Sequence, residues 1–177
     1  MNDPLPPTRA VLVTTPARWQ ALAEALPEHL LTRRPAAGEW SALECLQHLV
    51  DTEQWVFPVR VGAFLEGRDF PAFDPDAQGT PPDADADASQ LAARFADLRA
   101  RSLEALAAVS RADLARMARH AQLGPVSLAE LLHEWAGHDL MHTVQAERAL
   151  LQPFIEGTGP WRPYFADHDV EQPQTGE

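Results

Sequence analysis

The chain has 177 residues, a length that suits one domain with or without tails, and 45% of them are hydrophobic, enough for a sizeable core. Its formal charge of −12, from 26 acidic and 14 basic residues, disfavours nucleic acid and anionic lipid as partners. The single cysteine, Cys45, excludes an intrachain disulfide and cysteine-rich zinc or iron–sulfur sites. The sequence contains no apolar run of membrane-spanning length and no secretion-signal pattern at its N-terminus. We therefore expect a cytoplasmic protein with no nucleic-acid or membrane partner.

The N-terminal segment contains three prolines in its first fourteen residues and shows no helical period. Residues 1–14 are therefore expected to form an extended arm. Thr15 followed by Pro16 is typical of an N-cap with proline at the first helical position. This pair predicts the start of a first helix that carries Trp19 and Leu26 on its apolar side.

A second, long helix is predicted over residues 41–66. Ser41 can cap its start, and Glu44 stands three residues later, where it completes a capping box. Pro58 is expected to kink this helix because proline removes one backbone hydrogen bond. The following stretch, residues 67–88, contains four prolines and is the least structured part of the chain. Its length allows the helices before and after it to run parallel.

A third helix is predicted over residues 89–109, with Arg94, Arg99 and Arg101 on its exposed side. Residues 110–126 form a region of weaker helical pattern. No segment shows the two-residue alternation of a β-strand convincingly.

The last helix is predicted to begin at Ser127 and Glu130, which again have capping-box spacing, and to end near Leu151. The tail, residues 152–177, is expected to be irregular and to pack partly on the body of the protein. Four helices joined by long connections predict an all-α fold, a four-helix bundle over residues 15–151.

The last predicted helix carries two histidines on its core-facing side. Its seam toward the bundle interior comprises Leu128, Leu131, Trp135, His138, His142, Gln145 and Ala149. Histidines four residues apart project from one face of a helix, close enough to bind one divalent ion. A buried polar group without a partner costs about 1–3 kcal/mol, so both rings need a partner. Metal binding, mutual hydrogen bonding and a hydrated cavity would each supply one.

His48 is the best candidate for a third ligand because it lies in the middle of the second helix among apolar residues. A single core-facing histidine is more often a hydrogen-bonded structural residue, whereas three such residues favour a metal. His133 precedes His138 by five residues and points elsewhere, so Glu134 does not belong to a His-Glu-x-x-His protease motif. Three further histidines lie in predicted turns or in the tail and are expected at the surface: His29, His120 and His168.

Four polar side chains near these histidines can orient an imidazole through its second nitrogen: Glu44, Asp51, Asp139 and Gln145. Simple solvent exposure is an equally good interpretation of each. Cys45 lies three residues before His48 and can replace or join it as a soft ligand. A lone helical cysteine is, however, usually a small core residue.

Two segments resemble the DinB-like superfamily: Gly38-Glu-Trp-Ser-Ala-Leu-Glu-Cys-Leu-Gln-His48-Leu, and Leu131-Leu-His-Glu-Trp-Ala-Gly-His138-Asp-Leu-Met-His142-Thr-Val-Gln145. The resemblance covers residues 15–151. It implies a four-helix bundle in up-down-down-up order and a divalent ion, commonly nickel or zinc. The family's three histidine ligands map onto His48, His138 and His142, and a homodimer would also suit the family.

The resemblance does not fix the reaction. Characterised members include thiol S-transferases that use bacillithiol or mycothiol, and a mycothiol-dependent maleylpyruvate isomerase. We therefore expect an enzyme that acts on a small molecule and whose ion activates a bound low-molecular-weight thiol. Arg60, Arg99 and Arg101 are candidates for holding the carboxylate of that thiol. Two alternatives remain open: a metal-dependent hydrolase of small substrates, which activates water, and a non-catalytic metal-binding protein of the stress response.

Overall fold

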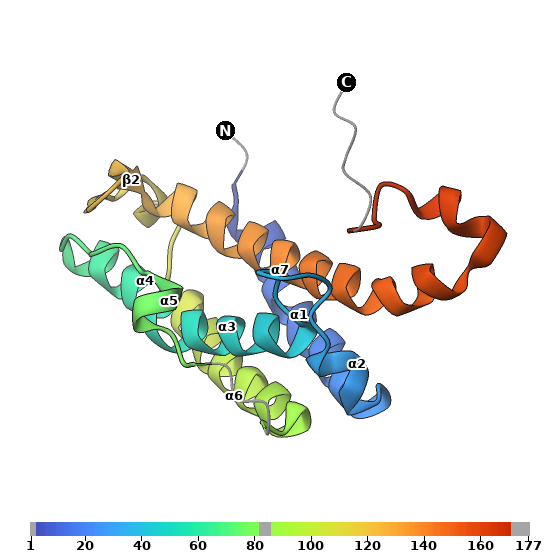
Figure 1. Cartoon of the computed structure of the whole chain (residues 1–177). Coiled ribbons are helices and arrows are strands. Elements are labelled where there is room, and N and C mark those ends of the chain that lie inside the picture. The colour runs from blue at the N-terminus through green and yellow to red at the C-terminus, as the bar shows by residue number, and fades with distance from the viewer. Residues whose placement is uncertain (1–2, 82–85, 171–177) are drawn as a thin grey trace.

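Helices make up most of this computed structural model, which describes residues 3–81 and 86–170. The elements in chain order are α1 (Leu5–Ala25), α2 (Glu28–Thr32), α3 (Ala42–Trp55), α4 (Phe57–Glu66), α5 (Pro75–Gln78), α6 (Ala88–Ala107), the 3-10 helix η1 (Asp113–Ala115), β1 (Met117–His120), β2 (Gly124–Ser127), α7 (Leu128–Gly157) and the 3-10 helix η2 (Gly159–Phe165). Four long units form a bundle: α1, α3 continued by α4, α6 and α7 (Figure 1). The predicted four-helix bundle is confirmed.

Two hydrophobic clusters fill the bundle, one toward each end. The first cluster includes Leu12, Phe57, Val61, Phe64, Leu106, Leu131, Leu132 and Trp135. The second cluster includes Trp19, Leu46, Leu49, Phe95, Ala146 and Leu150. Each of the four units contributes to both clusters, and each fully buried Leu or Phe side chain contributes about 1.5–3 kcal/mol to folding.

The two clusters also define the direction of each helix. Both α1 and α7 run from the first cluster to the second, whereas α3–α4 and α6 run from the second to the first. Helices α1 and α3 each contact both α6 and α7. Of these neighbouring pairs, α3 and α6 run in the same direction, and so do α1 and α7. This is the up-down-down-up order, and the long connection between α4 and α6 makes it possible (Figure 1).

Local sequence signals set the starts of two long helices as expected. Ser41 and Glu44 form a complete capping box at α3, and Ser127 and Glu130 form another at α7. The predicted kink near Pro58 is a break between α3 and α4 at Val56, whose φ of −115° and ψ of −75° interrupt the helix. Pro58 then lies in the first turn of α4. A backbone N–H at this position would have no acceptor within the helix, so proline removes no hydrogen bond from it.

The prediction of an extended arm over residues 1–14 is wrong, because α1 begins at Leu5; residues 1–2 lie outside the described residues. Prolines near the start of α1 fit its first turn, in which no intrahelical N–H bond is required. Thr15 and Pro16 lie inside α1 and do not begin it. A buried stripe with helical spacing runs along α1 and indicates that the helix includes the residues before Thr15. It comprises Thr8, Leu12, Thr15 and Trp19.

The weakly patterned region 110–126 contains an unpredicted antiparallel hairpin, β1 with β2. Its strands are only four residues long, too short for an alternating pattern to be evident. A bridge between Phe70 and His120 ties the connection after α4 to this hairpin. The hairpin therefore covers the end of the bundle at which α4 ends and α7 begins (Figure 1).

Helix α7 continues past the predicted end at Leu151 to Gly157, and the following segment turns back toward it (Figure 1). The Gln152 side chain donates to the carbonyl of His168 and accepts from the backbone N–H of Val170. The part of the tail beyond residue 170 lies outside the described residues. Among the described helices, none combines the length and the apolarity needed to cross a membrane.

A buried ionic cluster links all four units of the bundle. Arg99 of α6, expected at the surface, is only 1% exposed and pairs with Glu53 of α3 and Asp139 of α7 at 2.7–3.0 Å. Arg99 also donates to the carbonyl of Leu12 in α1 at 3.0 Å. That carbonyl is free because Pro16, four residues later, has no N–H to donate.

Replacing Arg99 with Met would leave two carboxylates buried without a counter-charge. We expect Arg99→Met to lower the free energy of unfolding by about 3–5 kcal/mol. Arg101→Met, at an exposed position of the same helix, should change it by less than about 0.5 kcal/mol. Urea denaturation of both variants measures the difference, and equal stabilities would contradict the structural role of Arg99. Adding Glu53→Gln and Asp139→Asn to Arg99→Met should recover part of the loss.

Candidate metal centre

Three imidazole rings meet between α3 and α7, as the sequence predicted. His48 comes from α3, while His138 and His142 come from adjacent turns of α7. The Nε2 atoms of His48 and His138 are 3.0 Å apart, and the ring centroid of His142 lies 4.5 Å and 4.4 Å from theirs. One ligand nitrogen of each ring lies within 4.8 Å of the other two, a spacing at which three donors can share one ion.

The three rings are neutral at physiological pH. Burial, reinforced by the neighbouring His142, lowers the pKa of His48 to about 4. Burial together with both neighbouring histidines lowers the pKa of His138 to about 2. The pKa of His142 is also lowered by burial, although Gln145 and Asp139 oppose the shift. Neutral imidazole is the form that binds a metal, so the donor set fits a divalent ion such as zinc or nickel.

Gln145 orients one ring of the cluster. Its side-chain oxygen lies 2.8 Å from Nδ1 of His142, which leaves Nε2 of that ring for the cluster. This is the role that the sequence suggested for Gln145. Nδ1 of His138 is buried and has no partner among the described residues, so packing against Phe57, at 5.1 Å between centroids, holds that ring instead.

The other polar candidates near the rings have different partners. Glu44 is occupied by the capping box with Ser41 and by an ion pair with Arg34, and Asp139 is occupied by Arg99. The expectation that they orient an imidazole is therefore wrong for both, because their carboxylates are already bonded elsewhere. Asp51 accepts hydrogen bonds from the backbone and side chain of Thr80.

Cys45 does not join the three rings. Its side chain is fully buried in the second hydrophobic cluster, and burial raises its pKa to about 12. A thiol in this environment is a small core residue and not a metal ligand.

Aromatic side chains surround the rings. Trp40 stacks on His142, with 5.7 Å between centroids and 19° between planes, and lies 4.9 Å from His48. Phe73 lies 6.5 Å from His48 and Phe57 lies 5.1 Å from His138, both measured between ring centroids. Trp40 belongs to the segment that resembles the DinB-like family, and its indole covers one face of the His142 ring.

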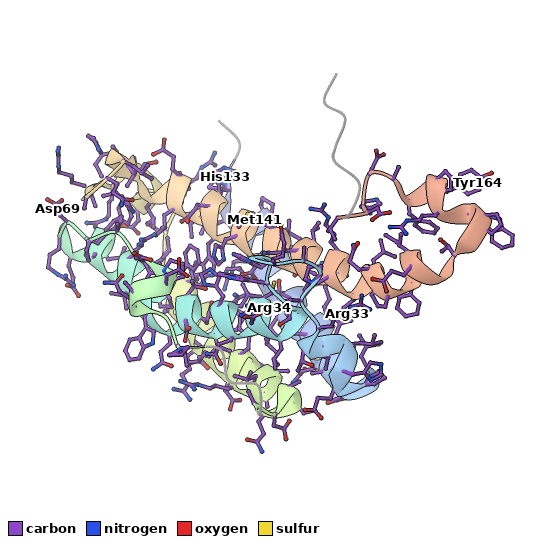
Figure 2. All side chains as sticks on the ribbon, viewed as in Figure 1. Arg33, Arg34, Asp69, His133, Met141 and Tyr164 are labelled. Atoms are coloured by element: carbon purple, nitrogen blue, oxygen red, sulfur yellow. The ribbon has the colours of Figure 1, made fainter. Side chains whose placement is uncertain are left out.

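A cleft with a volume of about 420 Å³ gives access to the three rings. Its lining includes Trp40, His48, Phe57, Arg60, Phe73, His120, Glu134, His138, Met141 and His142. Met141 lies on the accessible side of α7 (Figure 2). The cleft gives a small molecule a route to the three nitrogens, as a catalytic site requires and a closed structural site does not.

Arg60 and His120 line this cleft, although sequence reasoning placed His120 at the surface. That placement is wrong: His120 is 8% exposed, because the hairpin folds it under Phe70. His29, His133 and His168 are exposed, and His133 projects from α7 away from α3 (Figure 2). Among the three arginines considered as carboxylate binders, the structure places only Arg60 in the cleft wall.

The lowered pKa values predict how the metal-free protein responds to acid. The unfolded chain takes up protons at these histidines near pH 6.5, whereas the folded protein cannot protonate His48 until about pH 4. The contribution of the neutral rings to stability is therefore complete above pH 6.5 and is lost as the pH falls from there toward 4. We expect a lower free energy of unfolding at pH 5 than at pH 7, measured by urea denaturation with a chelator present. His138→Gln should weaken this dependence, and a pH-independent stability would contradict the assignment.

Comparison with known proteins agrees with this fold. A solved structure, YfiT from Bacillus subtilis, superposes with a TM-score of 0.72 at 20% sequence identity, over 82% of this chain and 85% of that one. That protein is described as a probable metal-dependent hydrolase with an unusual four-helix bundle topology. The comparison with curated proteins gives no match. The family model of the DinB superfamily matches residues 12–146, so the chain belongs to the DinB superfamily.

Proposed function

We propose that this protein is a divalent-metal-dependent enzyme that transfers a low-molecular-weight thiol to an electrophile. The observation that supports the proposal is the convergence of three neutral imidazoles, from His48, His138 and His142, at the wall of an accessible cleft. A divalent ion held by these rings would lower the pKa of a bound thiol or water toward neutrality. Imidazole nitrogen is a suitable donor for zinc and for nickel, the two ions that are common in the family.

The residues of the chain have separate tasks in this proposal. His48, His138 and His142 supply the ligand nitrogens, and Gln145 fixes the orientation of His142. Trp40 and the two phenylalanines around the rings exclude water from the reacting group and so strengthen electrostatic interactions there.

A thiol is the better nucleophile for this site because few groups nearby can accept a proton. A free thiol has a pKa of about 8.5 and loses its proton far more readily than water, whose pKa is about 15.7. The carboxylates of Glu44 and Asp139 are both bonded to arginines, so neither can act as the general base that activation of water favours.

A metal-dependent hydrolase is the second candidate, and Glu134 is the observation that favours it. Its carboxyl lines the same cleft one helical turn before His138, and partial desolvation at the cleft wall raises its pKa above the usual value. A carboxylate with a raised pKa suits a general base that accepts a proton from water. YfiT, which shares the fold, is described as a probable hydrolase.

Metal affinity should depend on the ligands and on the residue that orients one of them. We expect His48→Ala to abolish tight binding of Zn²⁺ or Ni²⁺, and Gln145→Leu to weaken it by about 10–100-fold. His133→Ala, at an exposed position of the same helix, is the matched control and should bind like the wild type. Isothermal titration calorimetry measures all four proteins. Unchanged affinity in His48→Ala would refute the three-histidine site.

The reaction is tested with purified, metal-loaded protein, a thiol and monochlorobimane as the electrophile. Bacillithiol, mycothiol, glutathione and cysteine are compared, and conjugation is followed by fluorescence. We expect one thiol to be strongly preferred, and we expect His142→Ala or chelation to reduce the rate to the uncatalysed level. A rate that neither change affects would refute metal-dependent thiol transfer.

The hydrolase alternative is separated from thiol transfer in the same experiment. Nitrophenyl acetate is supplied without any thiol, and nitrophenol release is measured. Metal-dependent hydrolysis that falls in Glu134→Gln, together with no conjugation of any thiol, would favour the hydrolase.

A further inference from the structure

Two arginines are buried in the described part of the chain, Arg60 and Arg99, and of these Arg99 has its charge neutralised at close range. All five N–H groups of Arg99 donate at 2.7–3.0 Å, four to the carboxylates of Glu53 and Asp139 and one to a backbone carbonyl. Arg60 is 8% exposed, yet within the described chain its nearest carboxylate oxygen, from Glu134, is 4.0 Å away. That distance is too long for a hydrogen bond.

The other contacts of Arg60 do not neutralise its charge. The guanidinium lies over the ring of Phe70, at 5.2 Å from the centroid, and its Nη2 atom is 3.5 Å from Nε2 of His120. Burial lowers the pKa of Arg60, yet arginine remains charged at any physiological pH. A buried cation without a bonded anion is costly, and such groups normally have a partner.

His120 presents a second donor at the same point. Its Nδ1 accepts hydrogen bonds from the backbone N–H groups of Gln122 and Leu123, at 3.1 and 3.3 Å. Nδ1 is therefore unprotonated, and the proton of the neutral ring is on Nε2. The guanidinium of Arg60 and the Nε2–H of His120 are both donors 3.5 Å apart, so they do not bond to each other. An acceptor placed between them would satisfy both.

This pair of donors lies in the cleft that reaches the three histidines. Glu134, beside Arg60, precedes His138 by one turn of α7, a rise of roughly 6 Å. A recess of about 160 Å³ adjoins the pair. Besides Arg60, His120 and the two glutamates Glu130 and Glu134, its lining consists of apolar side chains: Phe70, Leu123, Val126 and Leu131. The surroundings thus provide two donors for an anion, apolar walls beside them and an open path to the rings.

We propose that Arg60 and His120 bind the carboxylate of a small ligand whose opposite end reaches His48, His138 and His142. Arginine binds a carboxylate through two parallel N–H bonds, and the Nε2–H of His120 supplies a third donor. The substrate or co-substrate is thus a compact carboxylic acid with a short apolar spacer and a terminal thiol. The identity of that end rests on the proposed function, whereas the carboxylate subsite does not.

Glu134 partly balances the positive charge of Arg60 from outside the donor pair. Its side chain is 51% exposed, so it weakly offsets the charge of Arg60 from the rim of the cleft without filling the space between Arg60 and His120. An incoming carboxylate therefore competes with a half-exposed Glu134 and gains closer contact with the guanidinium. Removing the Glu134 charge should strengthen carboxylate binding.

The experiment compares mercaptopentanoate with mercaptopentanol, which differ only at the end away from the thiol. Isothermal titration calorimetry with the zinc-loaded protein should show at least about tenfold tighter binding of the acid. Arg60→Gln should abolish this preference. Arg101→Gln, which removes one positive charge from an exposed position, should retain it. Equal affinities for acid and alcohol in the wild type, or a preserved preference in Arg60→Gln, would overturn the proposal.

A second measurement does not require the metal or an intact Arg60 variant. Pentanoate added to the metal-free protein should shift the backbone amide resonances of Gln122 and Leu123, which bond to His120. Glu134→Gln should bind pentanoate several-fold more tightly than the wild type. If pentanoate binds in this way but no thiol binds to the zinc-loaded protein, the proposed function fails while the subsite stands. Absence of the shifts, with no gain in Glu134→Gln, overturns the subsite.

Discussion

The arrangement of this bundle depends on one buried cation, the guanidinium of Arg99. Its five N–H groups reach α1, α3 and α7 from α6, so a single side chain fixes the relative height of all four units. Hydrophobic contacts tolerate sliding of one helix along another, whereas paired hydrogen bonds to Glu53 and Asp139 do not. Because Asp139 directly follows His138 in the sequence, this bonding also holds α7 at the height where its rings meet His48.

The fold could be predicted where the signal is local. The capping boxes at Ser41 and Ser127 are adjacent in sequence to the helices that they start, and both are confirmed. The first part of α1, residues 5–14, was missed because its prolines suggested an extended chain, although proline is compatible with a first turn. The hairpin was missed because its four-residue strands are too short to show an alternating pattern, and the bridge that anchors it joins Phe70 and His120 across fifty residues. Short strands of this kind depend on tertiary contacts that no local pattern contains.

The convergence of the three histidines was predictable because their spacing places them on the core-facing sides of two amphipathic helices. Arg99 shows the limit of that reasoning: a charged side chain was assigned to the surface by type. Its spacing shows the opposite, since Ala92, Phe95, Arg99, Ser102 and Leu106 form one buried stripe. Arg60 and His120 could not be paired from the sequence, because the hairpin that brings them together was itself not predicted. The position of a residue in the helical pattern thus predicted its burial better than the charge of its side chain did.

The position of Cys45 has a consequence for an enzyme that handles electrophiles. Such a protein is exposed to the alkylating reagents that it consumes, and an accessible thiolate would be the first group to be modified. The only sulfhydryl of the chain is enclosed by Trp19, Leu46 and their neighbours, and its pKa of about 12 keeps it protonated. In the proposed thiol transfer, the burial of Cys45 would therefore protect the protein from alkylation by its own electrophile.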